Sequence, residues 1–169
     1  MDAVIRDATP ADLPHIVEIY NSSIPGRLAT SDLEPVTVEG QRGWFQSHTP
    51  DKHPLWVYEQ DGRIAAWIGL RAFYGRPAYH ATAEVSVYVA PEFHRRGIAP
   101  ILLERMKTKC PELGIRTLLA FVFGHNDPSL RLFERAGFVR WGQFPTVAEL
   151  DAVWRDLVIL GWKTEVQSR

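Results

Sequence analysis

One short stretch of the sequence, FHRRGIAPILLE at positions 93–104, combines the residue types of an anion site. Arg95 and Arg96 stand directly before Gly97, and the apolar spacing that follows predicts a helix. Free backbone N–H groups at a helix N-terminus bind anions, and glycine lets a phosphate approach the backbone closely. The stretch is therefore a candidate phosphate cradle. The alternative is an ordinary turn with solvated arginines, since neither the Walker nor the G-x-G-x-x-G spacing is present.

Metal and thiol chemistry are not indicated elsewhere. The six histidines are scattered, with no H-x-H or H-E-x-x-H spacing, so no metal site is expected. Cys110 is the single cysteine and stands at the end of an expected helix, which favours a structural role over a nucleophilic one. One cysteine also excludes an internal disulfide and fits a reducing compartment.

The composition fits one domain over residues 1–169, with 46% hydrophobic and 23% charged residues. A formal net charge of −1 argues against a nucleic-acid or anionic-membrane partner, because either would require a surplus of Lys and Arg. The arginine pair is therefore expected to serve a small anion. No signal segment and no apolar run of membrane-spanning length is visible, so a cytoplasmic location is expected.

The elements that must position the cradle follow from periodicity. Residues 80–89, HATAEVSVYV, alternate as a strand, with Val85 and Val87 on one side and Glu84 and Ser86 on the other. Pro100 falls in the first turn of the next helix, where a missing N–H breaks no helical bond. It is expected to delay the helix start by one residue and to leave the cradle with one amide fewer.

The other elements complete an α/β chain with a mixed sheet rather than a regular βαβ repeat. Thr9 is the expected N-cap of the first helix, and Asp61-Gly62 is a tight-hairpin signal. Gly137 is the expected C-terminal glycine of the last helix. The expected order is a strand at 3–8, a helix at 9–23, a helix near 38–48, a hairpin at 54–73, the strand at 80–89, a helix to about 109, a strand at 116–123, a helix at 126–137 and strands at 138–144 and 154–162.

Three ordered motifs carry a family resemblance. VSVYVAPEFHRRGIAPILLE resembles the acyl-CoA pyrophosphate loop of the GNAT superfamily of N-acetyltransferases, with pattern [Q/R]-x-x-G-x-[G/A]; His94, Gly97 and Ala99 take its first, fourth and sixth positions. HNDPSLRLFERAGF resembles the Asn-started helix across the CoA cleft. YGRPAYHATAEVSVYV is similar to the phosphinothricin acetyltransferase-like subfamily. The resemblance covers most of the chain and is weakest between residues 25 and 50.

The resemblance implies a single-domain α+β fold with a mostly antiparallel mixed sheet, flanking helices and a V-shaped split between two central parallel strands, at 85–89 and 118–123. Acetyl-CoA would be the cosubstrate, with its pantetheine arm in the split and its pyrophosphate on the loop amides. For Asn126, capping the following helix is an alternative that is compatible with binding pantetheine. The implied cofactor-binding residues are Val87, Tyr88, Val89, His94, Arg95, Arg96, Gly97, Ile98, Ala99, Asn126, Ser129 and Phe133.

The resemblance also implies a catalytic base. An alkyl amine is protonated at neutral pH and must lose that proton before it attacks a thioester. In the resembled subfamily the glutamate at the position of Glu84 has this role, directly or through water, and a backbone N–H near Val89 would meet the developing oxyanion. The alternative for Glu84 is a solvated strand carboxylate.

The loop LRAFYGRPAYH supplies the expected acceptor-binding residues. Arg71 or Arg76 would grip an amino-acid carboxylate bidentately, and Tyr74 and Tyr79 would wall the amine. The alternative is that the arginines are simply solvated.

Three departures from the family pattern bear on function. His94 replaces the usual Gln or Arg, and Phe133 replaces the Tyr or His that protonates the leaving thiolate, although a CoA thiol can leave unassisted. The subfamily tends to show a basic residue and a glycine before W-x-D, whereas this chain keeps Trp154 and Asp156 but has acidic Glu149 and Asp151 nearby, which weighs against phosphinothricin or methionine sulfoximine as the acceptor.

The expected function is thus acetyl-CoA-dependent transfer of an acetyl group to the primary amine of a small amino-acid-like acceptor, directly in a ternary complex. Two alternatives stay open. A protein or peptide amine acetyltransferase would need a wider cleft, and Phe133 would suit a CoA-binding regulatory module without turnover. A homodimer is expected by analogy with the resembled family.

Overall fold

The structure, a computed structural model, describes residues 2–165. Its strands and helices follow the expected order closely. The elements are β1 (Ala3–Asp7), η1 (Pro10–Asp12), α1 (Leu13–Ser22), α2 (Val38–Gln46), β2 (Leu55–Gln60), β3 (Arg63–Ala72), η2 (Pro77–Tyr79), β4 (Thr82–Val89), η3 (Pro91–Phe93), α3 (Ile98–Lys109), β5 (Thr117–Phe123), α4 (Asp127–Arg135), β6 (Val139–Leu150) and β7 (Val153–Lys163).

All seven strands form one sheet in the order β1-β2-β3-β4-β5-β7-β6. Every pairing is antiparallel except β4 with β5, which is parallel and covers only three residue pairs, ending at Glu84 and Leu119. Beyond that pair the two strands run on without pairing, which is the V-shaped split that the resemblance implies. The expected fold class is confirmed.

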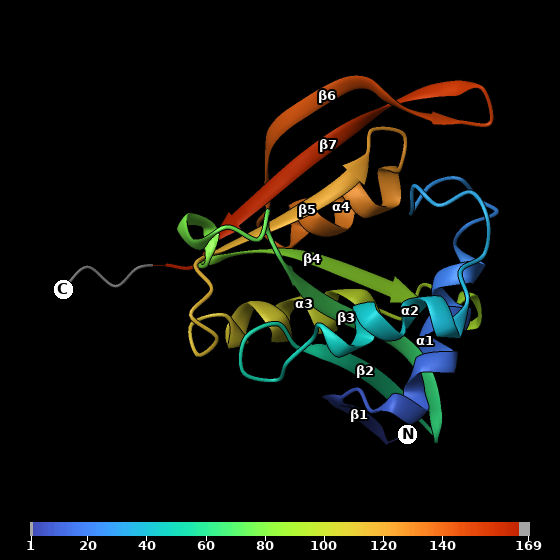
Figure 1. The fold of residues 1–169 in the computed structure, drawn as a ribbon, viewed down its shortest axis with the longest axis vertical. Coiled ribbons are helices and arrows are strands. Elements are labelled where there is room, and N and C mark those ends of the chain that lie inside the picture. Colours follow the sequence, from blue (N-terminus) through green and yellow to red (C-terminus); the bar gives the residue numbers. More distant parts are fainter. Residues whose placement is uncertain (1, 166–169) are drawn as a thin grey trace.

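Helices cover both faces of the sheet. Figure 1 shows α1 and α2 in front of the strands and α3 behind them. Both α1 and α3 contact the same two strands, β3 and β4, as expected when one helix lies on each face of the sheet. One apolar core runs through both layers, and Ile68, Leu70, Leu102 and Leu103 are completely buried in it. The central strands are therefore held rigidly between helices.

Turn geometry explains where the expected boundaries hold and where they fail. Asp61 and Gly62 both have positive φ, as a two-residue hairpin turn of type I′ requires. The last hairpin is longer than expected because Asp151 and Ala152 make a turn with φ values of 52° and 63°. That turn carries no glycine, so the sequence gives no signal for it.

The expected late start of the cradle helix is wrong. Helix α3 begins at Ile98, directly after Gly97, whose φ is 75°. Pro100 is the third residue of the helix, within the first turn, where backbone N–H groups have no intrahelical partner to lose. The proline therefore leaves the preceding Ala99 helical.

The N-terminus of the first helix is fixed by an ion-pair cluster. The Arg6 guanidinium lies 2.7 Å from the Asp12 carboxylate and 2.9 Å from that of Glu59, joining β1 to η1 and β2. The Asp12 carboxylate also accepts from the Thr9 backbone N–H at 2.7 Å, which confirms Thr9 at the helix start. The Arg6 hydrogen bond is the largest influence lowering the pKa of Asp12 from 3.8 to about 2.

The Asp12 cluster predicts a pH-dependent stability. Because the folded-state pKa of Asp12 lies below its unfolded value, its contribution is present above about pH 5 and is lost as the pH falls towards 2. We expect Asp12→Asn to lower the free energy of unfolding by about 2 kcal/mol at pH 7, with a smaller loss at lower pH. Urea unfolding from pH 7 to pH 2 measures this, with Asp51→Asn as an exposed control. An equal loss at every pH would contradict the prediction.

Candidate active site

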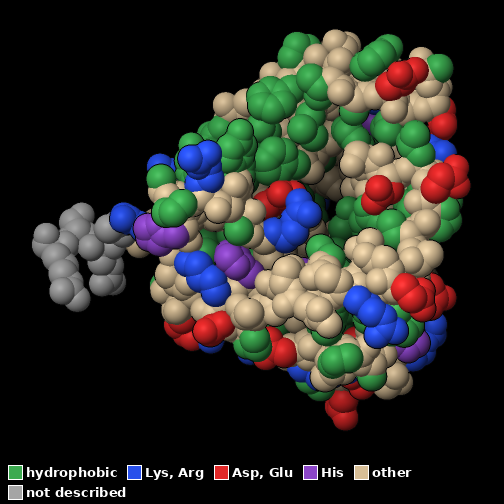
Figure 2. All heavy atoms as spheres, in the orientation of Figure 1, with side chains coloured by type: hydrophobic (Ala, Val, Ile, Leu, Met, Phe, Trp, Pro, Cys, Tyr) green, Lys and Arg blue, Asp and Glu red, His purple; other side chains and the backbone are tan. Residues whose placement is uncertain are grey.

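A cavity of about 620 Å³ opens on the α1–α2 face, beside the split. Figure 2 shows this face hollowed next to charged side chains. One end is lined by Phe121, Phe123, Asn126, Ser129 and Phe133 from β5 and α4. The opposite end is lined by side chains of α1, α2 and β3, and the cavity-facing residues of β4 run between the two ends.

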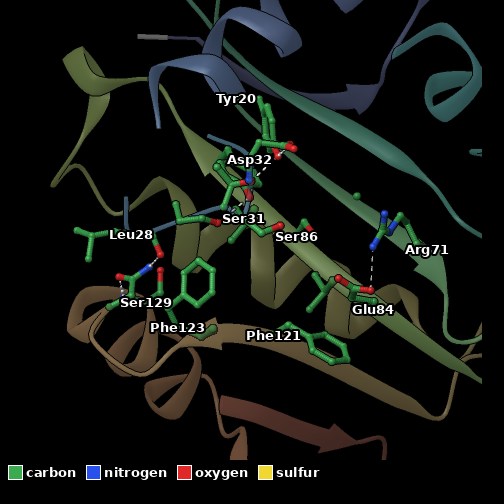
Figure 3. A pocket seen from close by; sticks show the side chains of 18 of the residues that line it. Tyr20, Leu28, Ser31, Asp32, Arg71, Glu84, Ser86, Phe121, Phe123 and Ser129 are labelled. Atoms are coloured by element: carbon green, nitrogen blue, oxygen red, sulfur yellow. Dashed lines mark hydrogen bonds and ion pairs between the residues drawn. The ribbon is translucent and has the colours of Figure 1, made fainter. Parts of the chain in front are cut away.

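The lining of the cavity contains an ion pair. Arg71 and Glu84 are register partners on β3 and β4, and their side chains are 3.0 Å apart (Figure 3). Glu84 also belongs to the last β4–β5 pair, with Leu119, so its carboxylate stands at the apex of the split. The Glu84 side chain is 22% exposed and reachable from the cavity. A carboxylate in this position is suited to accept a proton from an amine in the cavity.

The open edge of β4 fits an extended ligand. Strand β4 pairs with β3 as far as Val89, but in the described part of the chain its other edge has no strand partner beyond Glu84. The backbone N–H and C=O groups on this edge can therefore form hydrogen bonds with a ligand that carries amides. Val87 and Tyr88 from this edge line the cavity, as the resemblance implies for pantetheine-binding residues.

The cradle loop has the geometry of an open anion site. Arg95 and Gly97 both have positive φ, and a Cβ added at Gly97 would meet nothing within 4 Å. The backbone is therefore exposed at the N-terminus of the twelve-residue helix α3, which fits a phosphate group. The Arg96 guanidinium lies 5.0 Å from the Phe93 ring centroid, which holds this charge beside the loop.

His94 braces the cradle to the strand. Its Nε2 is 2.9 Å from the Val89 carbonyl oxygen and donates to it, because a carbonyl only accepts. His94 takes the position in the family pattern that would donate to a phosphate. Here its side chain also holds the loop against the end of β4. None of residues 94–99 lines the cavity itself.

Residues 24–36, called the strap from here on, cross from one side of the split to the other. The Tyr88 hydroxyl donates to the Ala29 carbonyl at 2.9 Å, on the β4 side. His125 bonds the carbonyl of Arg27 at 2.8 Å, on the β5 side. The Arg27 guanidinium pairs with Asp151 at 2.8 Å, in the β6–β7 turn. The strap therefore forms a wall of the cavity.

Asn126 serves both the helix and the strap. Its Oδ1 accepts from the Ser129 backbone N–H at 3.2 Å, as an N-cap, and its Nδ2 donates to the Leu28 carbonyl at 3.1 Å. The cap considered from the sequence is therefore present. Phe133 is buried against Phe138 and offers no polar group to the cavity.

The far end of the cavity is aromatic. Trp67 stacks on Tyr88 at 4.9 Å, and Trp44 meets the edge of Trp67 at 5.4 Å. Tyr20 packs on Tyr88 and hydrogen-bonds Thr30 and Asp32 of the strap. Burial is the main cause that raises the pKa of Tyr20 to about 12, and burial raises that of Tyr88 further, so both phenols are protonated at neutral pH.

The structure does not bring all the predicted acceptor residues together. Arg71 lines the cavity, whereas Tyr74, Arg76 and Tyr79 do not. Strand β3 ends at Ala72, and the two tyrosines beyond it pack on Phe73 and on each other, with Tyr74 75% exposed.

Sequence reasoning missed several cavity residues. Trp67 could have been predicted as a cavity residue. It is four residues before Arg71 on β3, so both side chains lie on the same face, and it pairs with Tyr88 of β4. His48, Trp44 and Asp32 lie in the region of weakest resemblance and give no such signal. Glu149 and Asp151, the acidic residues that weighed against two acceptors, do not line the cavity.

Within residues 2–165, no group of three or more His, Cys, Asp or Glu side chains is placed to hold a metal ion. No helix in that range is long and apolar enough to cross a membrane.

The model of the acetyltransferase (GNAT) family matches residues 13–138. This match covers more than half of the chain, so the chain belongs to the GNAT acetyltransferase family. The resemblance read from the motifs is confirmed, and with it the activity class, N-acetyltransferase.

Relatives align over nearly the whole chain. The Bacillus subtilis (strain 168) protein named "Putative phosphinothricin acetyltransferase YwnH" is 50% identical over 158 residues, 93% of this chain and 96% of that protein. The L-methionine sulfoximine/L-methionine sulfone acetyltransferase of Pseudomonas paraeruginosa is 29% identical, over 95% of this chain and 94% of that protein. The crystal structure of a phosphinothricin acetyltransferase from Sinorhizobium meliloti in complex with acetyl-CoA matches with a TM-score of 0.90 at 29% identity, over 96% of this chain and 89% of that one.

The double role of Asn126 predicts separable effects. We expect Asn126→Ser to retain a helix cap but release the strap, so that trypsin cleaves after Arg27 about fivefold faster, the value of one lost hydrogen bond. Asn126→Ala should release the strap equally and also lower the free energy of unfolding by about 1 kcal/mol through the lost cap. Limited digestion with mass spectrometry and urea unfolding measure the two effects. Unchanged cleavage at Arg27 in both variants would show that this bond does not hold the strap.

Proposed function

We propose that this acetyltransferase moves the acetyl group of acetyl-CoA to the primary amine of a small amino-acid-like acceptor, directly in a ternary complex. The observation that carries the proposal is the Arg71–Glu84 pair at the apex of the β4–β5 split, inside a cavity of about 620 Å³. Relatives named for L-methionine sulfoximine, L-methionine sulfone and phosphinothricin support an amino-acid acceptor, since each of these compounds carries a free α-amine.

The unpaired edge of β4 and the loop before α3 fit acetyl-CoA, which supplies an acetyl thioester when bound. The β4 edge at Val87, Tyr88 and Val89 would hold the pantetheine arm, and the loop from His94 to Ala99 would hold the pyrophosphate. Arg95, Arg96 and the α3 N-terminus supply positive potential there. Asn126, Ser129 and Phe133 would line the opposite side of the arm.

Glu84 would act as the general base. It would take the proton of the bound ammonium, directly or through water, so that the neutral amine can attack. A backbone N–H near Val89 would donate to the carbonyl oxygen as charge develops on it. Phe133 cannot protonate the leaving sulfur, and the thiolate is stable enough to depart without a protein acid.

Arg71 would bind the carboxylate of the acceptor. It is the guanidinium nearest to Glu84, and a fork of two N–H donors matches a carboxylate. An α-amino acid held there presents its amine on the Glu84 side, because its amine and carboxylate share one carbon. Tyr74, Arg76 and Tyr79 stay a prediction from the loop sequence without support from the cavity lining.

The cavity favours a small acceptor over a peptide. Its volume lies in the range of small-molecule sites, and the strap limits its opening beside the split. A regulatory CoA-binding module has no need of a carboxylate at the apex. Both alternatives are outcomes of a single assay, release of CoA thiol from acetyl-CoA with a panel of amino acids, small amines and peptides.

A homodimer and a cytoplasmic location belong to the same proposal. Figure 2 shows hydrophobic side chains gathered towards the β6–β7 end of the molecule. Light scattering of the purified protein decides the oligomeric state. The exposed apolar side chains of this hairpin are Val139, Trp141, Phe144, Val147, Val153 and Trp154.

The base role predicts the outcome of one substitution. We expect Glu84→Gln to lower kcat by about 100-fold, the usual scale for a general base, since the amide cannot take a proton. The matched control is Glu92→Gln, which removes an exposed carboxylate paired with Arg63 at 2.8 Å outside the cavity. Initial rates of thiol release at saturating acetyl-CoA measure the effect. A rate equal to that of the control would remove Glu84 from the role.

A further inference from the structure

The aromatic end of the cavity contains a polar side chain that the reaction does not use. His48 lies at the edge of the Trp44 ring, with centroids 4.8 Å apart, and lines the cavity together with Trp67 and Gly69. It follows helix α2 in a region where no family motif was found. One ring nitrogen, Nδ1, is hydrogen-bonded to the protein, whereas Nε2 faces the cavity, so Nε2 is the atom that can bind a ligand.

The protonation state of His48 follows from its contacts. Its Nδ1 is 2.9 Å from the Trp44 carbonyl oxygen, which only accepts, so Nδ1 carries the proton. Burial is the main cause that lowers the pKa of His48, and the Arg71 cation also contributes. The ring is therefore neutral at physiological pH, and Nε2 carries a lone pair.

The lone pair lies on the cavity side of the sheet. A Cβ built on Gly69 would be 3.3 Å from His48 Nε2, so the ring reaches over this glycine. Gly69 is the register partner of Ser86 and stands two residues from Arg71 on the same face of β3. Within residues 2–165, Nε2 makes no hydrogen bond. An acceptor atom is thus free one step along the strand from the Arg71–Glu84 pair.

We propose that His48 Nε2 is a specificity-determining acceptor, which receives a hydrogen bond from an N–H or O–H group on the side chain of the amino-acid substrate. This inference rests on the proposed function, because Arg71 and Glu84 hold the α-carboxylate and amine and direct the side chain towards the aromatic end. Trp44, Trp67 and Tyr88 enclose the apolar part of that side chain. Trp67 Nε1, a buried donor with no hydrogen-bond partner among the described residues, is a second polar group of this end.

The proposal selects between chemically similar acceptors. A side-chain N–H of the acceptor donates a hydrogen bond to the lone pair of His48 Nε2. An oxygen at the same position has only lone pairs of its own and is repelled by it. An anionic phosphinate oxygen is disfavoured further, since the ring is neutral and has no proton on Nε2 to offer. The expected order of acceptors is therefore a donor-bearing side chain, then a neutral side chain without a donor, then an anionic one.

L-methionine sulfoximine and L-methionine sulfone form a matched pair of probes, because they differ only by N–H against O at sulfur. We expect wild-type kcat/KM to favour the sulfoximine by about 10-fold, the value of one hydrogen bond to an otherwise unpaired acceptor in the cavity. His48→Phe keeps the ring but removes Nε2, so the ratio should fall to about 1 through loss on the sulfoximine. His48→Gln retains an acceptor near the Nε2 position and should keep part of the preference.

Two further variants complete the test. His53→Phe changes a histidine outside the cavity and should keep the wild-type ratio. Gly69→Ala leaves the imidazole chemistry unchanged but places a methyl group 3.3 Å from Nε2 and 3.1 Å from Leu55 Cδ1, so it should reduce the ratio by displacing the ring. The KM for acetyl-CoA should stay the same in all four variants.

The outcomes separate this proposal from the proposed function. A wild-type protein that acetylates no amine overturns the proposed function, and with it this inference. A wild-type protein that acetylates amines but takes neither probe, or takes both equally, overturns the His48 proposal alone. A preference that survives in both His48→Phe and Gly69→Ala also overturns it. Loss of the preference in both, with the His53→Phe ratio unchanged, supports it.

Discussion

The short parallel pairing of β4 with β5 is the constraint on which the site depends. Three residue pairs hold the two strands together, and the pairing stops at Glu84 and Leu119 although both strands continue. Backbone N–H and C=O groups that lose a strand partner inside a packed sheet cost free energy unless something else satisfies them. The fold therefore maintains an extended edge with unused hydrogen-bonding capacity, which an amide-bearing ligand can satisfy.

The antiparallel register of β3 with β4 decides what faces this split. Arg71 pairs with Glu84, Gly69 with Ser86 and Trp67 with Tyr88, so charged, small and aromatic pairs follow one another along a single face. A shift of one residue in either strand would turn that strand's three side chains to the opposite, apolar face of the sheet. The strap completes the enclosure, because its backbone carbonyls accept hydrogen bonds from Tyr88, His125 and Asn126 on both sides of the split.

Periodicity predicted the elements that carry the split, because each of them has one apolar face. It did not predict the strap, whose residues have no regular period and whose conformation is fixed by distant partners. Arg27 meets Asp151 across 124 residues of sequence, and the Leu28 carbonyl meets Asn126. Residue type alone placed the loop tyrosines at the acceptor site. Aromatic rings beyond a strand end can instead pack on one another. Tyr74 and Tyr79 do so, with ring centroids 5.9 Å apart.

Among the titratable groups around the cavity, one suits the proton transfer that the proposed function requires. Burial raises the pKa of the Tyr20 and Tyr88 phenols, and their hydroxyl groups are bonded to the strap. Burial lowers the pKa of His48, which disfavours its charged form. The Arg71 guanidinium has N–H donors and no acceptor atom. Of the two carboxylates among the cavity-lining residues, Asp32 accepts from Tyr20, and Glu84 stands where the strands diverge. Glu84 is therefore the group whose position and charge both suit proton transfer, with the Arg71 cation fixing where its carboxylate lies.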